Sequence, residues 1–178
     1  SFTLGFRGDD VVINGSSLPQ VQQVICTLTT AGLEVDEPGA QGWSFGVQPR
    51  GACWIADYST IGMASGTVAQ RGMVQAAGFE RTDILDDGAG IIQAVVLSFT
   101  TATTLSPADS PHDLLALRVG TDAPKGEDCQ TCSLTYAGDL QGEGQPVQLV
   151  TTWNGETYRP QHQNKVIQIC SPAACFEQ

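Results

Sequence analysis

The chain has 178 residues, 41% of them hydrophobic, which is enough for one domain with a buried core. Its 19 acidic and 8 basic residues give a net charge of −11, which argues against nucleic acid as a partner, because phosphate binding needs a basic surface. The apolar runs are all too short to cross a bilayer, so membrane insertion is not expected either.

The first residues alternate between apolar and small or polar side chains. In the opening stretch SFTLGF, the side chains of Phe2, Leu4 and Phe6 share one face, which is typical of a β-strand. We therefore predict an N-terminal strand or arm over residues 1–10. Because it precedes the first regular strand of the domain, we expect it to add to the sheet edge of a neighbouring copy.

From residue 11 to residue 170, apolar residues recur at spacing two, and Gly, Pro, Asn and Asp interrupt them at short intervals. This rhythm predicts an all-β domain, an antiparallel, jelly-roll-like sandwich of two sheets with about nine or ten strands. The expected strands are Val11–Ile13, Val24–Thr29, Trp43–Val47, Met73–Phe79, Ile91–Phe99, Leu114–Val119, Ser133–Tyr136, Val147–Trp153 and Val166–Cys170, with less regular candidates at Ala52–Ala56 and Gly66–Gln70.

The stretch QGWSFGV, residues 41–47, has the cleanest alternation. Trp43, Phe45 and Val47 share one face, and the small residues between them share the other. We predict that the three large side chains point into the core, with the small-residue face directed outward or toward a packed neighbour. The segment Ile91–Phe99 is apolar on nearly both faces and rich in β-branched residues, which predicts the most buried strand.

Cysteine usage indicates an oxidising compartment. We interpret the start at Ser1, without Met, as that of a mature chain whose export signal has been removed, and so expect a secreted or cell-surface protein. Spacing does not determine the pairing but favours Cys129–Cys132 and Cys170–Cys175, which leaves Cys26 with Cys53. The second bridge would pin a short C-terminal tail, residues 171–178. The disulfide candidates are Cys26, Cys53, Cys129, Cys132, Cys170 and Cys175.

The sequence contains no clear catalytic or cofactor motif. His112 and His162 lie in polar, Pro-flanked segments that we expect to be exposed loops, and the chain lacks the G-x-S-x-G elbow of many hydrolases. Asp83, Asp86 and Asp87 resemble a cation-binding loop, but their spacing misses the EF-hand pattern, so Ca²⁺ has no motif to support it. We therefore expect a non-catalytic protein without a cofactor or metal.

Two further features are candidate sites. Asn14 begins an N-x-[ST] sequon at a predicted turn, which makes it a candidate for glycosylation. Trp153 and Tyr158 flank an Asn-Gly pair that favours a hairpin turn, so both rings are candidates for stacking on a sugar.

The order of these segments resembles a known family. A Val-rich strand, QGWSFGV with its acidic approach loop, GIIQAVVLSF and TLSPADSPHDLLALRV are together similar to the cohesin-like domains of bacterial extracellular proteins, which are related in fold to carbohydrate-binding modules of families 2 and 3. The resemblance covers Val11 to Ile169. It implies a nine-stranded jelly roll that binds dockerin modules through one sheet face. Typical cohesins lack most of these cysteines, and the family's dockerin-contacting residues are not preserved here as a motif, so none is carried over.

We therefore predict a non-catalytic, secreted or cell-surface module for protein–protein interaction and assembly, which offers a sheet face or an edge strand to its partner. In one version the partner is another copy, and the chain is a self-associating subunit of an extracellular filament or layer. The alternative is a carbohydrate-binding module whose partner is a polysaccharide, based on the fold relationship and on Trp153 and Tyr158.

Overall fold

The computed structural model describes residues 1–64, 77–101, 103–126, 128–142 and 146–175. Within these residues there are thirteen strands and three short helical segments. They are β1 (Phe2–Arg7), β2 (Val11–Ile13), β3 (Gln20–Thr30), β4 (Gly42–Gly51), β5 (Cys53–Ser59), β6 (Phe79–Leu85), η1 (Asp86–Gly88), β7 (Gly90–Val96), η2 (Pro107–Asp109), β8 (His112–Thr121), β9 (Gln130–Ala137), β10 (Val150–Trp153), β11 (Glu156–Tyr158), β12 (Gln161–His162), β13 (Lys165–Cys170) and α2 (Pro172–Cys175).

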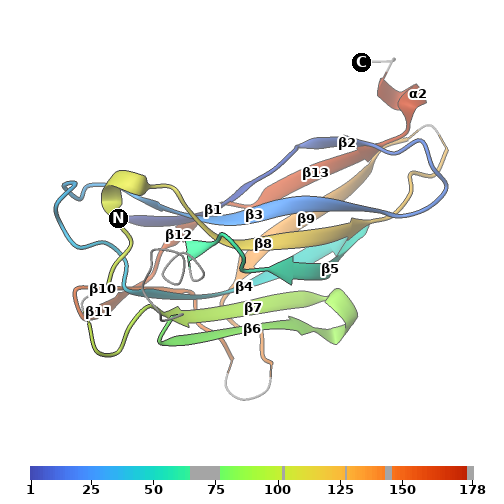
Figure 1. Cartoon of the computed structure of the whole chain (residues 1–178). Helices are drawn as coiled ribbons and strands as arrows, with labels where there is room; N and C mark the ends of the chain where they lie inside the picture. The colour runs from blue at the N-terminus through green and yellow to red at the C-terminus, as the bar shows by residue number, and fades with distance from the viewer. Residues whose placement is uncertain (65–76, 102, 127, 143–145, 176–178) are drawn as a thin grey trace.

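The strands form two sheets packed into a sandwich (Figure 1). The five-stranded sheet has the order β12-β1-β3-β8-β5. The eight-stranded sheet follows β11-β10-β4-β9-β13-β2, with β7 beside β4 and β6 beside β7. All pairings are antiparallel except β1 with β12 and β2 with β13, which are parallel. The predicted all-β sandwich is confirmed, with more strands than expected because several are only two to four residues long.

The N-terminal segment belongs to the chain's own sheet. β1 pairs with β3 from Phe2 to Arg7 and with β12 at Thr3 and Leu4. Phe2 and Leu4 are buried, and Phe6 stacks on Tyr136 with ring centroids 4.5 Å apart. The prediction that this strand adds to a neighbouring copy is therefore wrong for this structure, because both its backbone edges and its apolar face are used internally.

The alternation in QGWSFGV is confirmed as a core strand. Trp43 is 2% exposed, and Phe45 and Val47 are fully buried in the main apolar cluster between the sheets. On the neighbouring strand β7, Ile91 and Val95 also join this cluster. Each large side chain buried in this way contributes roughly 1.5–3 kcal/mol to folding.

A buried glutamine organises this part of the core. Gln93 on β7 has no exposed surface, and its Oε1 accepts a hydrogen bond of 2.9 Å from the indole Nε1 of Trp43. Its Nε2 donates to the hydroxyl of Thr82 on β6 at 3.2 Å. A polar side chain at this depth is tolerated because both ends of its amide are satisfied.

Replacing Gln93 by leucine is expected to lower the free energy of unfolding by about 2 kcal/mol, because the Trp43 N–H loses its acceptor without regaining water. Urea denaturation measures the difference. Gln48→Leu, on the outward face of β4, is the matched control and is expected to change stability by less than about 0.5 kcal/mol. Equal effects of the two substitutions would contradict the role given to Gln93.

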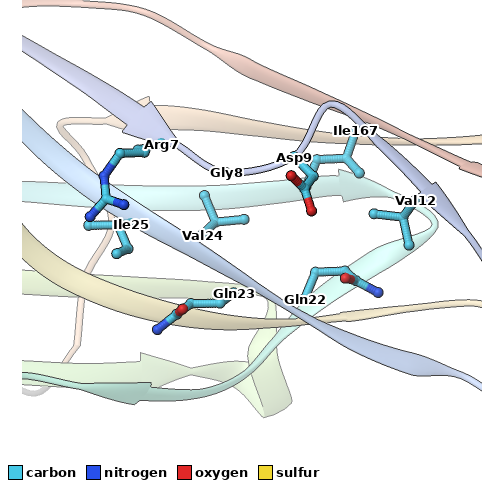
Figure 2. Close-up of a pocket in the computed structure, with 9 residues that line it drawn as sticks. All are labelled: Arg7, Gly8, Asp9, Val12, Gln22, Gln23, Val24, Ile25 and Ile167. Atoms are coloured by element: carbon cyan, nitrogen blue, oxygen red, sulfur yellow. The ribbon is translucent and has the colours of Figure 1, made fainter.

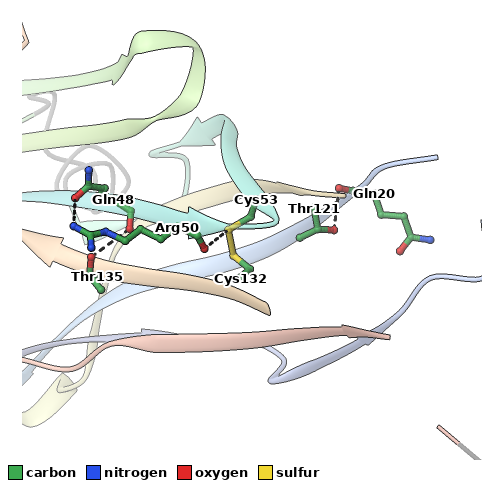
Figure 3. Close-up of a disulfide and its surroundings, with 7 residues drawn as sticks. All are labelled: Gln20, Gln48, Arg50, Cys53, Thr121, Cys132 and Thr135. Carbon is green, nitrogen blue, oxygen red and sulfur yellow. Dashed lines mark hydrogen bonds between the residues drawn. A yellow bond between two sulfur atoms is a disulfide. The ribbon is translucent and has the colours of Figure 1, made fainter. Parts of the chain in front are cut away.

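Two disulfides replace the predicted local bridges. Cys53 on β5 bonds to Cys132 on β9 and thereby joins the two sheets (Figure 3), and Cys129 bonds to Cys170 at the end of β13. Cys26 is a free, buried thiol. The predicted pairs Cys129–Cys132, Cys170–Cys175 and Cys26–Cys53 are wrong. The physical reason at the first pair is that three residues of extended chain span roughly 10 Å, beyond the Cα separation that a disulfide allows.

Two other boundaries differ from the prediction. The predicted strand Gly66–Gln70 lies outside the described residues, as do residues 73–76 of the next one, and β6 begins at Phe79. Asp83, Asp86 and Asp87, which resemble a loop in the sequence, do not all lie in one: residues 83–85 continue β6, and only Asp86–Gly88 turn, in a short 3-10 helix. The helices of the described residues are all too short to cross a membrane.

Candidate functional site

The outward face of the eight-stranded sheet is flat at its centre because its side chains are small. Ser44 on β4 lies opposite Ala94 on β7, which in turn lies opposite Arg81 on β6. One row further, Gly46 lies so close to Leu140 that an added methyl group would be 2.9 Å from Leu140 Cδ1. The small-residue face of QGWSFGV therefore points outward, and the segment after β9 covers part of it.

Beside this flat centre is a shallow hollow of about 400 Å³. Phe79, at the start of β6, is 44% exposed on its wall, and Phe99, which is 72% exposed, lies beside Gly78. Arg81 Nε donates to Asp83 Oδ2 at 2.6 Å, which places one ion pair at the rim. We call this surface the β6–β7 face; the hollow is lined by Ser44, Phe79, Arg81, Ile92, Ala94, Pro146, Val147, Gln148 and Val150.

The β6–β7 face also ends in an open strand edge, because β6 pairs only with β7 among the described strands. Behind it, the Tyr58 hydroxyl donates to the carbonyl of Thr82 at 3.2 Å. Burial raises the pKa of Tyr58, and the negative charges of Glu80, Asp83 and Asp57 raise it further. This edge therefore carries acidic groups next to exposed aromatic rings, a combination suited to contact with a protein surface.

A second hollow, of about 240 Å³, lies where the chain crosses from one sheet to the other (Figure 2). Gly8 links β1 to the segment that leads into β2, and beyond this point residues 20–24 of β3 have no strand partner on that side. Val12, Val24 and Ile167 form the apolar part of its lining, and the other lining residues are Arg7, Gly8, Asp9, Gln22, Gln23 and Ile25.

A third hollow, of about 630 Å³, lies around the outer side of β1. Its two cations are both neutralised: Lys165 Nζ lies 2.5 Å from Asp10 Oδ1, and Arg7 Nη2 lies 2.6 Å from Asp113 Oδ2. With its charges paired, this hollow has no unbalanced charge to attract an ionic ligand.

The two histidines lie on different strands, β8 and β12. Asp113 is held by Arg7 rather than by the adjacent His112, whose Nε2 lies 2.8 Å from the carbonyl oxygen of Ser106. Both histidines were expected in exposed loops. Instead His112 begins β8 and His162 ends β12, and of the two only His162 is exposed. In the part of the chain that the structure describes, no three His, Cys, Asp or Glu side chains gather as metal ligands.

The side chain of Asn14, the first residue of the sequon, is buried and hydrogen-bonded within its own turn. Asn14 is 1% exposed, its Nδ2 donates to the carbonyl of Leu18 at 2.9 Å, and its Oδ1 accepts from the Ser16 amide at 2.8 Å. A glycan on this nitrogen is incompatible with the observed packing, which corrects the expectation of glycosylation. The side chain instead fixes the turn between β2 and β3.

The proposed sugar-stacking pair does not form one flat surface. The ring planes of Trp153 and Tyr158 meet at 61°, with centroids 5.7 Å apart. Trp153 packs against the core and its Nε1 donates to the carbonyl of Pro38 at 2.6 Å, whereas Tyr158 bonds to Glu156. The two rings form an edge-to-face contact within the β10–β11 hairpin, and the Trp153 hydrogen bond joins this hairpin to the loop that contains Pro38.

Sequence reasoning missed the β6–β7 face. Phe79, Arg81 and Asp83 alternate with Glu80 and Thr82, and the alternation alone does not reveal that the aromatic end of the strand faces outward. The signal that was present lies in the first half of β4, where the outward residues Gly42, Ser44 and Gly46 are small and therefore mark a face that something else can approach closely.

No protein-family model matches the chain, and no curated protein resembles it in sequence. Solved structures do resemble it in fold. A type I cohesin in a cohesin–dockerin complex from Clostridium thermocellum superposes with a TM-score of 0.62 at 8% identity, over 96% of this chain and 94% of that one.

Two further cohesins agree. The seventh type I cohesin of a scaffoldin from Pseudobacteroides cellulosolvens gives a TM-score of 0.56 at 8% identity, over 97% and 92% of the two chains. The sixth cohesin of a scaffoldin from Acetivibrio cellulolyticus, solved with a dockerin, gives 0.54 at 12% identity, over 96% and 98%. The alignments span nearly the whole of both partners, and the chain therefore has a cohesin-like β-sandwich fold.

Proposed function

We propose that this chain is a non-catalytic module that binds a folded protein partner through the β6–β7 face. The observation that carries the proposal is the exposure of two aromatic rings, Phe79 on the wall of the hollow and Phe99 beside Gly78, near a sheet surface of small residues. Partly exposed aromatic rings next to a shallow hollow are typical of the few residues that dominate binding energy at protein interfaces.

The fold supports this class of function. Cohesins from Clostridium thermocellum and Acetivibrio cellulolyticus have been solved as complexes with dockerins, so dockerin modules are the first partners to try. We also propose that the module works outside the cell, as part of a larger assembly. Its two disulfides support that compartment, since such bonds persist where the surroundings are oxidising.

The test compares the wild type with the double variant Phe79→Ala/Phe99→Ala against a panel of immobilised dockerins, and in parallel by sedimentation velocity for self-association. We expect the wild type to bind a dockerin or to self-associate, and the double variant to bind at least roughly tenfold more weakly because the apolar anchors are lost.

The matched control is Leu18→Ala/Val35→Ala, which removes two exposed apolar side chains from loop residues that do not line the hollow. It is expected to bind like the wild type. Self-association that depends on Phe79 would favour the filament or layer subunit over a heterologous partner. A wild type that binds no dockerin and stays monomeric, or equal weakening of both double variants, would contradict the proposal.

A further inference from the structure

The five-stranded sheet carries a tryptophan on its outward face. Along β5 the side chain of Ile55 is 2% exposed and points into the core, so its neighbour Trp54 points the opposite way. Trp54 is only partly buried and is not packed against the core. Its register partners are Gly120 on β8 and, beyond that, Val21 on β3, which is 47% exposed.

The indole of Trp54 lies flat on the sheet. A methyl group placed on Gly120 would be 2.2 Å from Cε2 of Trp54, and 2.5 Å and 2.6 Å from Cζ2 and Nε1. Both of the latter atoms are bonded to Cε2, and their nearly equal, longer distances place the methyl position over the ring face rather than at its edge. Gly120 therefore leaves room for one face of the indole, and the ring, which is only partly buried, keeps some exposed surface on the outward side of the sheet.

Exposed polar residues lie beside this ring. Arg118 lies opposite Asp57 on β5 and Gln23 on β3, and all three residues are exposed. Within the described ranges, neither the Arg118 guanidinium nor the Trp54 Nε1 has a hydrogen-bond or ion-pair partner, whereas the cations of Arg7 and Lys165 are paired. The ring offers an apolar surface, and the unpaired N–H groups beside it offer hydrogen-bond donors. Together they suit a ligand that is apolar on one side and polar at its edge.

A pyranose ring has this chemistry, because its axial C–H groups form an apolar face and its equatorial hydroxyls project from the edge. We propose that Trp54 is a stacking platform for a neutral, β-linked polysaccharide, with Arg118 and Asp57 as hydrogen-bonding partners for the hydroxyls of one sugar ring. A neutral glycan is favoured over an anionic one because the chain carries a net charge of −11. The site lies on the opposite sheet from the β6–β7 face. It therefore goes beyond the proposed function, and the two proposals can be tested independently.

The test measures retention of the whole chain on insoluble cellulose, xylan and chitin. We expect the wild type to bind at least one of the three. Trp54→Ala should lower the partition constant on that polysaccharide at least tenfold, and Arg118→Ala severalfold. Trp153→Ala is the matched control because its ring packs edge-to-face with Tyr158 and offers no flat outward face; it should be retained like the wild type.

Because Trp54 also covers Gly120, a folding defect must be separated from a binding defect. Trp54→Phe keeps a ring over the glycine, and its retention should be intermediate. In the wild type, titration with the soluble hexasaccharide of the retained polymer should shift the indole N–H resonance that is missing in Trp54→Phe. Failure of the wild type to bind all three polymers, retention of Trp54→Ala equal to wild type, or a shift confined to another indole would overturn the proposal.

Discussion

Replacing Cys53 and Cys132 together by alanine is expected to lower the free energy of unfolding by about 4 kcal/mol. The bond closes a segment of 79 residues and joins the two sheets, so its loss restores a large amount of conformational freedom to the unfolded chain. Chemical denaturation of the purified domain measures the change, and the midpoint should fall without a matching change in the native circular dichroism spectrum.

The second disulfide supplies the comparison. Cys129 and Cys170 are 41 residues apart and connect neighbouring strands of one sheet, so the corresponding double variant is expected to lose less stability. Reduction of the wild type should reproduce the sum of both losses. A Cys53/Cys132 variant as stable as the wild type, or one less affected than the Cys129/Cys170 variant, would contradict this assignment.

Alkaline solution is expected to destabilise the domain through Cys26. Complete burial raises the pKa of this thiol from 9.0 to about 12, against a smaller lowering by its hydrogen bond with Tyr136. A raised pKa means that the folded chain holds the proton after the unfolded chain has released it. The contribution to stability is therefore complete below pH 9 and is lost between pH 9 and pH 12, by up to about 4 kcal/mol.

Tyr136 acts in the same direction. Burial raises the pKa of its hydroxyl well above the usual value, and the neighbouring Cys26 raises it further. Stability measured in urea from pH 8 to pH 11 should fall steeply for the wild type and less steeply for Cys26→Ala. The comparison rests on the slope with pH, because the alanine also leaves a cavity that lowers stability at every pH. Identical slopes for the two proteins would show that this thiol does not titrate as expected.

Much of the sandwich was predictable because the pattern that identifies its central strands lies within their own sequences. In β4 the large residues Trp43, Phe45 and Val47 alternate with small ones over one continuous stretch, and burial of one face follows directly from the pleat. The short strands β11 and β12 carry no such pattern. They exist because longer strands offer them backbone partners, which is information from distant parts of the chain.

The cysteine pairing failed for a related reason. Which cysteines meet depends on the registers of β5, β9 and β13, and spacing along the chain contains none of that information. The prediction of glycosylation at Asn14 was wrong for a different reason, since it assumed that the side chain points outward from the turn. The turn is present, but the amide folds back to satisfy the backbone of Leu18 and Ser16.

The candidate surfaces were the least predictable part. Phe79 and Trp54 both face outward, yet nothing in their own segments distinguishes them from core aromatics such as Phe45. For Trp54 the informative residue is Gly120, which is 66 positions away and becomes its neighbour only through the register of β5 and β8. A glycine in the middle of a strand signals a close approach, but the sequence does not say by what.

The two parallel strand pairs join the first strands of the domain to its last strands. β1 pairs with β12 and β2 pairs with β13, so two strands from the start of the domain are completed by two strands from its end. Until these last strands are in place, one backbone edge of β1 and one edge of β2 stay open. The domain therefore reaches its native pairing only when both of its ends are available, and a fragment cut before β12 is expected to leave these two strand edges exposed.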